Sequence, residues 1–221
     1  MLGAVIGLVA VAYNRALLAT TAAFEHLALP VEARAALIGA AVGALGWVYP
    51  GVVGGGDAIT QGALTGGQGL QLVALVFLIR FGLGAVSYSA ATPGGLFAPL
   101  LALGALFGLV FAATWRWAFP ALDVPAQSFA LVGMAAFFAG VVRAPLTGMV
   151  FVSEMTGNVT LLLQMLGACA TAMLVPALLR NPPIYDSLRK DMLRRARDGA
   201  TRTVAIAASA AGEDSAGPGA M

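Results

Sequence analysis

The chain has 221 residues, of which 60% are hydrophobic and only 10% carry a charge, and its mean hydropathy is +0.90. Soluble domains carry about 25% charged residues, so this composition excludes a water-soluble protein and indicates one that lies in a lipid bilayer. Several apolar runs approach the ~20 residues that a helix needs to cross a bilayer, and they lack the alternation of barrel strands. We therefore expect an all-α, polytopic helical membrane protein.

Positive charge is concentrated towards the C-terminus, although the net charge is only +2. Seven of the twelve basic residues fall within 180–202, namely Arg180, Arg189, Lys190, Arg194, Arg195, Arg197 and Arg202. Because lysine and arginine gather on the cytoplasmic side of membrane proteins, we expect a cytoplasmic C-terminus. This topological role is favoured over binding of nucleic acid or of lipid head groups, and no nucleic-acid partner is expected.

The apolar runs divide the chain into a series of expected helices. In chain order they cover 1–24, 35–49, 70–91, 97–115, 128–142, 146–153 and 159–179, with a short helix expected over 57–65 and a loop over 119–127. Two of these runs, 128–142 and 146–153, are short and are separated by a segment that contains Pro145. Short spans interrupted by proline or glycine are typical of the broken helices that surround a mid-membrane site in transporters.

Three of these runs contain glycines spaced four residues apart. The first pair, Gly3 and Gly7, has the small-x3-small spacing that permits close contact between helices. The same spacing occurs at Gly39 and Gly43 and at Gly104 and Gly108. The sequence does not say which helices these pairs meet.

Charged residues inside the apolar runs need an explanation, because a charge in the bilayer is costly unless it faces a cavity or a partner. Arg80 lies in the middle of 70–91 and either anchors packing at an interface or lines an aqueous pathway. Arg143 and Glu154 would be ~16 Å apart on a single helix. They are therefore not a simple pair, and each is expected to have a partner elsewhere.

The segment Thr92-Pro93-Gly94-Gly95-Leu96-Phe97-Ala98-Pro99 separates two long apolar runs. Its glycines allow a tight turn with a bare backbone, and its last proline suits the first turn of a helix. A helix that begins here, inside the membrane, leaves its first N–H groups without intrahelical partners. These donors and the helix dipole would form an anion site without a charged side chain. The alternative is a loop at the membrane surface.

The last expected helix is amphipathic and runs from Ile184 to about Asp198, after the break at Asn181-Pro182-Pro183. Tyr185 lies in its first turn, where a tyrosine is most often a residue of the interfacial aromatic belt. Its hydroxyl could instead be offered to an anion. Residues 199–221 are rich in Ala, Gly and Ser and are expected to form a flexible tail.

Taken together, these landmarks resemble the C-terminal half of the CLC family of chloride channels and proton-coupled chloride exchangers. The resemblance covers about residues 1–196 and rests on three segments that occur in the family's order. The first, Gly95-Leu96-Phe97-Ala98-Pro99, is similar to the anion-site motif G-x-F-x-P, and the second, Gly140 to Gly148 with Glu154-Met155-Thr156-Gly157, resembles the late-helix pair. The third, Pro183-Ile184-Tyr185, resembles the segment with the chloride-coordinating tyrosine.

The resemblance implies a fold and a site. The fold is the second half-repeat of a CLC-like protein, with broken and tilted helices over 1–198 and a cytoplasmic tail over 199–221. The site for chloride, the transported ligand, comprises Gly95, Leu96, Phe97 and Tyr185, with the amides of Leu96 and Phe97 and the hydroxyl of Tyr185 facing the ion. The family also implies a homodimer in the lipid bilayer, with the first helix and those near 146–156 and 159–179 facing the partner.

The sequence departs from the family because the motifs of the N-terminal half, including the one with the gating glutamate, are absent from these residues. Glu154 does not take that role, since its context differs from the gating motif. We therefore expect chloride transport by a channel or a proton-coupled exchanger whose N-terminal half is missing here. The alternative is a truncated or split membrane subunit without transport of its own.

An enzyme is not expected, and neither is a cofactor or a metal site. The sequence has no Ser/His/Asp grouping and no cofactor motif. His26 is the only histidine, and no second His, Cys or carboxylate cluster accompanies it, so it is expected at the interface with water. The single cysteine, Cys169, lies in an apolar run and is expected to pack in the interior.

Overall fold

A computed structural model describes residues 1–26, 30–53, 61–62, 69–90, 95–122, 124–189 and 193. Throughout these residues the regular structure is helical. The elements are α1 (Leu2–His26), α2 (Val31–Val48), the 3-10 turn η1 (Pro50–Val52), α4 (Leu70–Tyr88), α5 (Phe97–Ala118), α6 (Ala126–Val142), α7 (Pro145–Thr156) and α8 (Leu162–Leu178). The chain divides into two compact units, Met1–Asn181 and Pro182–Met221.

The expectation of a helical membrane protein is confirmed. Within the described ranges, four helices are long and apolar enough to cross a membrane, namely α1, α2, α4 and α5, and α6 and α8 are shorter apolar helices. The short helix expected over 57–65 lies outside the described residues, except for positions 61 and 62, which are helical.

Several boundaries differ from the prediction by three or four residues. Helix α2 begins at Val31 instead of 35, and α5 ends at Ala118 instead of 115. Helix α7 extends to Thr156 instead of ending near 153. Its polar residues continue the helix by donating side-chain hydrogen bonds back to helix carbonyls. Ser153 Oγ donates to the Val150 carbonyl at 2.8 Å, and Thr156 Oγ1 donates to the Val152 carbonyl at 2.7 Å. Such bonds satisfy hydroxyl groups without breaking the helix, so the polar residues did not mark its end.

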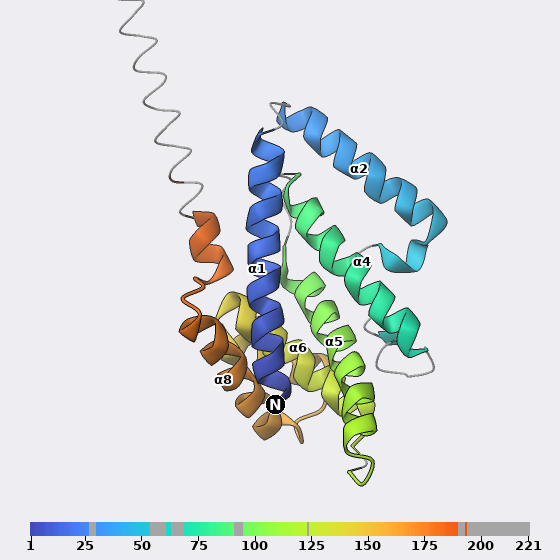
Figure 1. The fold of residues 1–221 in the computed structure, drawn as a ribbon, viewed down its shortest axis with the longest axis vertical. Coiled ribbons are helices and arrows are strands. Elements are labelled where there is room, and N and C mark those ends of the chain that lie inside the picture. The colour runs from blue at the N-terminus through green and yellow to red at the C-terminus, as the bar shows by residue number, and fades with distance from the viewer. Residues whose placement is uncertain are drawn as a thin grey trace, which may run out of the picture. The chain divides into compact units, whose positions relative to one another are not determined.

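Helix α6 forms the centre of the first unit. Every residue from Ala130 to Val141 is buried, and α6 contacts α1, α5, α7 and α8. In Figure 1 it lies behind α1, between α8 and α5. A helix that is apolar on all sides is expected in such a surrounded position, and the sequence of α6 has only Gln127 and Ser128 as polar side chains, both in its first turn.

Helices α5 and α6 cross at main-chain contact because glycines face each other. A Cβ added at Gly104 would lie 2.5 Å from the carbonyl oxygen of Gly133 and 2.7 Å from the Cα of Met134. A Cβ at Gly108 would overlap the carbonyl oxygen of Phe129. The Gly104 and Gly108 pair of the sequence therefore marks the α5–α6 interface.

The first glycine pair lies where α1 meets α8, as its spacing predicts. A Cβ at Gly3 would overlap Thr171 Oγ1, and one at Gly7 would lie 3.0 Å from the Ala172 carbonyl oxygen. Pro176 lies inside α8 and has no N–H to donate to that carbonyl. The carbonyl is left free to face α1, and the glycine gives it room.

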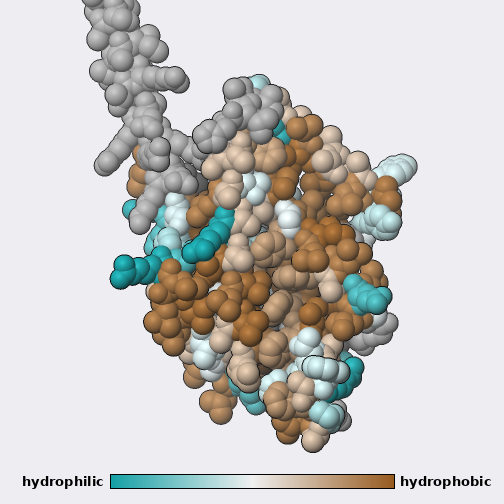
Figure 2. Space-filling model, in the orientation of Figure 1, coloured by the Kyte–Doolittle hydropathy of each residue, from teal (hydrophilic) through white to brown (hydrophobic). Residues whose placement is uncertain are grey.

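The pair Gly39 and Gly43 in α2 differs from the other two. Among the described residues, nothing lies within 4 Å of a Cβ added at either position. Helix α2 contacts α4 and η1 but buries only Arg34 and Ile38. Apolar residues cover most of the surface in the view of Figure 2, in keeping with a bilayer around the helices.

The second unit contains a short helix over residues 184–189. It starts directly after Pro183, whose carbonyl accepts hydrogen bonds from the Ser187 N–H at 3.2 Å and from the Ser187 Oγ at 3.3 Å. The start of this helix is as predicted. Its expected continuation to Asp198 lies outside the described residues, except for Leu193, which is helical.

Candidate functional site

Helix α5 begins at Phe97, inside the segment that the sequence singled out. Leu96 is the N-cap residue, and no side chain caps the helix. The Leu100 N–H donates to the Leu96 carbonyl at 3.0 Å, and Pro99 has no N–H. Among the residues that the structure describes, no acceptor meets the amides of Leu96, Phe97 or Ala98. Positions 92–94 of the predicted segment lie outside the description.

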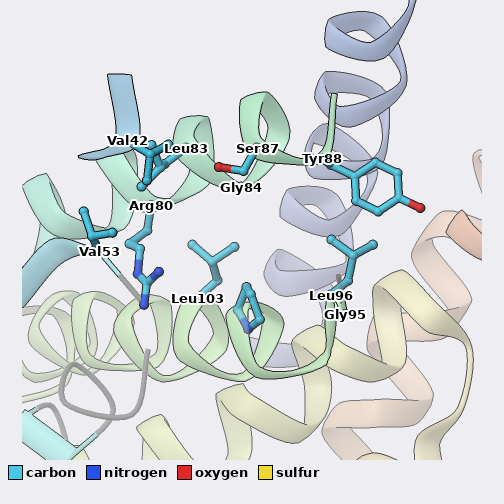
Figure 3. A pocket seen from close by; sticks show the side chains of 11 residues that line it. Val42, Val53, Arg80, Leu83, Gly84, Ser87, Tyr88, Gly95, Leu96 and Leu103 are labelled. Atoms are coloured by element: carbon cyan, nitrogen blue, oxygen red, sulfur yellow. The ribbon is translucent and has the colours of Figure 1, made fainter. Parts of the chain in front are cut away.

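A cavity of about 240 Å³ lies beside this helix start, between α4 and α5. Figure 3 shows side chains from both helices converging on it. The residues that line it are Val42, Val53, Arg80, Leu83, Gly84, Ser87, Tyr88, Gly95, Leu96, Pro99 and Leu103. The cavity therefore brings the predicted anion-site residues Gly95 and Leu96 together with polar side chains of α4.

Arg80 supplies a positive charge to this cavity. Only 7% of its surface is exposed, and its guanidinium points from α4 towards α5 in Figure 3. Arg80 thus lines a cavity between helices, and the aqueous pathway that the sequence offered as one of two interpretations stays a prediction. The sequence predicts an anion site without a charged side chain, and this stays a prediction; Arg80 lines the cavity that Leu96 also lines.

The ring of Phe97 is directed into the protein interior. It packs edge-on against Phe138 of α6, with ring centroids 4.8 Å apart, and against Phe151 of α7, at 4.4 Å. Edge-to-face pairs at these separations are favourable. They hold the first turn of α5 in place through the side chain.

Three of the four predicted site residues lie together at the start of α5. Gly95 and Leu96 line the cavity, and Phe97 follows them in the first turn of α5. Tyr185 belongs to the second unit, where 47% of its surface is exposed. Its association with the α5 start remains a prediction.

Helix α4 contributes more to the cavity than Arg80, the one residue of this helix that the sequence singled out. Ser87 and Tyr88 line the cavity, and both follow Arg80 at the spacing of one helix face, seven and eight residues later. This pattern was the available signal, because a stripe of polar residues along one face of an apolar span indicates a cavity or a pathway. It was obscured by the apolar residues on the other faces of α4.

Arg143 and Glu154 are separate, as their spacing predicts. Arg143 Nη2 donates a hydrogen bond to the main-chain oxygen of Asn181 at 2.8 Å. Glu154 is exposed near the end of α7. The expectation that Arg143 has a partner elsewhere in the chain is therefore confirmed, and this partner is a main-chain carbonyl.

The fold is that of a multi-span helical membrane protein in which a helix starts beside a cavity that an arginine lines. The sequence matches the voltage gated chloride channel family over residues 1–177, and the chain belongs to that family. The resemblance drawn from the three sequence segments is thus confirmed.

Two similar proteins are named as H⁺/Cl⁻ exchange transporters. The chain is 36% identical over 206 residues to the H⁺/Cl⁻ exchange transporter ClcA of Vibrio parahaemolyticus, a match that covers 88% of this chain and 44% of the relative. It is 40% identical over 159 residues to ClcA of Klebsiella pneumoniae subsp. pneumoniae, covering 72% of this chain and 34% of that protein. The chain thus spans less than half the length of these relatives.

Solved structures show the same fold. A slow cyanobacterial Cl⁻/H⁺ antiporter superposes with a TM-score of 0.81 at 30% identity, covering 87% of this chain and 46% of the antiporter. A eukaryotic CLC transporter superposes with a TM-score of 0.71 at 27% identity, covering 85% of this chain and 33% of that structure. The expected CLC-like fold is confirmed by these likenesses.

Proposed function

We propose that this chain carries part of the chloride site of a membrane chloride transporter. The observation that carries the proposal is the start of α5 at Phe97, without a side-chain cap and with a cavity beside it. Unpaired amides at a helix N-terminus, together with the helix dipole, attract an anion. Gly95, Leu96 and Phe97 would supply these donors, and the Tyr185 hydroxyl would supply a further one.

Main-chain donors suit the task of transport. Chloride must lose part of its hydration to enter the site and must leave again rapidly, so its binding has to be favourable but weak. Amide dipoles replace the lost water without the strong attraction of a directly paired cation. Arg80, at the wall of the same cavity, would raise the local chloride concentration without closing over the ion.

Exchange of chloride for protons is the form of transport that we favour over a channel. The named relatives are H⁺/Cl⁻ exchange transporters, and one similar structure is a Cl⁻/H⁺ antiporter. Their activity belongs to proteins about twice as long as this chain. We therefore propose that exchange requires this chain together with the sequence that corresponds to the rest of those relatives.

The alternative function is that of a membrane subunit without transport of its own, and the coverage of the relatives favours it for the chain alone. Chloride flux from liposomes that hold this chain together with the sequence corresponding to the rest of the relatives separates the two functions, because flux supports a chain that carries part of the transport site and its absence supports a subunit without transport. Liposomes that hold only this chain test whether it needs that complementation. No flux from a folded chain that binds chloride supports a partial site that needs complementation. Flux comparable to that of a full-length exchanger would contradict the need for a second half.

Assembly as a homodimer is part of the proposal. Helices α7 and α8 expose large apolar side chains, among them Leu146 at 68% and Leu163 at 78% of their surface. A second copy or lipid would cover them in the bilayer. We also propose a cytoplasmic C-terminus, which the cluster of basic residues over 180–202 supports.

Substitution of Tyr185 by phenylalanine tests the proposed site directly. We expect Tyr185→Phe to weaken chloride binding about fivefold, because a hydrogen bond of this kind contributes about 1 kcal/mol. The measurement is titration calorimetry with chloride on the purified full chain in detergent, with gluconate as the replacement anion. Liposome flux of the full-length assembly with the same substitution is the second readout.

Tyr49→Phe is the matched control, because Tyr49 is also exposed, at 61%, but follows the end of α2. We expect its chloride affinity to equal that of the wild type. Equal affinities for Tyr185→Phe and the wild type would remove the hydroxyl from the site. A folded wild-type chain without measurable chloride binding would contradict the proposed function for the chain alone.

A further inference from the structure

Arg143 ends α6 in a backbone conformation that is unusual for an arginine. Its φ is 66° and its ψ is 32°, in the left-handed region that glycine adopts most readily. Its N–H donates to the Ala139 carbonyl at 2.9 Å and closes the last turn. Among the described residues, Arg180 is the one other residue besides glycine with a positive φ, at 50°. Because this conformation is unfavourable for arginine, we expect a contact of its side chain to explain why an arginine occupies the position.

The side chain of Arg143 reaches the end of another helix. Its Nη2 donates to the carbonyl oxygen of Asn181 at 2.8 Å, across 38 residues of sequence. Both residues belong to the first unit. The left-handed turn at the end of α6 directs the chain into α7, and the guanidinium of the same residue joins that turn to the exit of α8.

Two main-chain hydrogen bonds cap the C-terminal end of α8. The Asn181 N–H donates to the Pro176 carbonyl at 2.9 Å, and the Arg180 N–H donates to the Ala177 carbonyl at 3.1 Å. With the left-handed Arg180 between them, these bonds form a Schellman motif. Asn181 is thus held on both sides, because its N–H bonds to α8 and its carbonyl bonds to Arg143.

Only a short and stiff segment separates this anchored residue from Tyr185. Asn181 is followed by Pro182 and Pro183, and the short helix with Tyr185 begins at Ile184. Proline fixes its own φ and restricts the residue before it to extended conformations. The two prolines therefore limit the backbone conformations of the link that begins at the Asn181 carbonyl.

We propose that Arg143 is a positioning residue for the anion site, which it serves by fixing the point from which the Tyr185 segment departs. The inference rests on the proposed role of Tyr185 in binding chloride. The guanidinium acts through the Asn181 carbonyl and has no contact with the ion. Its hydrogen bond ties the break between α6 and α7 to Asn181, the residue that precedes the two prolines.

The chain offers a matched pair of variants that isolate the side chain from the backbone. Arg143→Gly removes the guanidinium but suits the left-handed conformation, so the turn itself is retained. Arg180→Gly makes the same substitution at the other left-handed arginine, which is exposed. Glycine is the preferred residue at that position of a Schellman motif, so Arg180→Gly keeps the α8 exit intact.

Two measurements on the purified full chain test the proposal. In hydrogen–deuterium exchange, Arg143→Gly should speed amide exchange over residues 179–189 roughly tenfold, and Arg180→Gly should not speed it. In chloride titration, Arg143→Gly should bind about fivefold more weakly at an unchanged unfolding temperature. Arg143→Lys retains one charged donor and should recover part of both losses.

The outcomes separate this inference from the function on which it rests. If the wild type and Tyr185→Phe differ in chloride affinity but Arg143→Gly matches the wild type, the positioning role is wrong and the anion site stands. Unchanged exchange over 179–189 in Arg143→Gly also overturns it. If the wild type binds no chloride, the proposed function fails, whatever the exchange measurement gives.

Discussion

Replacement of Gly108 by leucine is expected to prevent α5 from packing on α6 and to leave the protein unfolded or aggregated in detergent. A Cβ at this position would overlap the Phe129 carbonyl oxygen and lie 2.8 Å from the Cα of Ala130. These are main-chain atoms of a fully packed helix, so no rotamer change can make room. We expect a loss of more than about 4 kcal/mol in the free energy of unfolding.

The smaller substitution Gly108→Ala places the same Cβ against these main-chain atoms without the rest of the leucine side chain, so α5 and α6 must shift apart slightly. We expect it to fold with a loss of about 3 kcal/mol, the upper end of the usual effect of an extra methyl group in a filled interior. The measurement is the unfolding midpoint of the purified protein, together with its elution as a single species in size-exclusion chromatography. The graded response of alanine and leucine distinguishes a steric effect from a general intolerance of α5 to substitution.

The second pair of glycines in the chain supplies the control. Gly43 has the same spacing from Gly39 as Gly108 has from Gly104, but among the described residues nothing lies within 4 Å of a Cβ at Gly43. Gly43→Ala should therefore leave the midpoint unchanged or raise it slightly, since alanine favours the helix by about 1 kcal/mol over glycine. A Gly108→Leu protein that unfolds at the wild-type midpoint would show that the close crossing of α5 and α6 is wrong.

The contrast between these pairs shows which features of helix packing can be predicted from the sequence. Spacing identifies a glycine face that allows a close approach, and this was correct for Gly3 and Gly7 against α8. Spacing does not identify the partner, because that depends on which helix the connecting loops bring alongside. The pairs at Gly43 and Gly108 have the same pattern, yet only the latter meets another backbone among the described residues.

The candidate site was predictable in its local chemistry but not in its surroundings. A helix start at Phe97 follows from the glycines and from Pro99, which are local signals. The arrival of Arg80 beside that start depends on the packing of α4 against α5, which no residue of the segment specifies. The partner of Arg143 was equally unpredictable. The sequence indicated that Arg143 needs a partner, but the Asn181 carbonyl that it binds is 38 residues away.

Substitution of Arg80 by glutamine is expected to weaken chloride binding by tenfold or more. Arg80 is 93% buried and lines the cavity of about 240 Å³ that Gly95 and Leu96 also line. An anion inside a space of this size would lie within about 8 Å of the guanidinium, where one unit charge at an effective dielectric constant of about 20 contributes on the order of 2 kcal/mol. Arg80→Glu reverses the charge and should reduce affinity further.

The measurement is chloride affinity by calorimetry at two ionic strengths, alongside the unfolding midpoint of each variant. Arg116→Gln is the matched control, since Arg116 is exposed in the last turn of α5 and is outside the cavity. Arg80→Lys retains the charge and should keep most of the affinity. If Arg80→Gln is folded and binds chloride as the wild type does, the charge at this wall of the cavity has no part in holding the anion. The main-chain donors at the start of α5 would then account for binding without it.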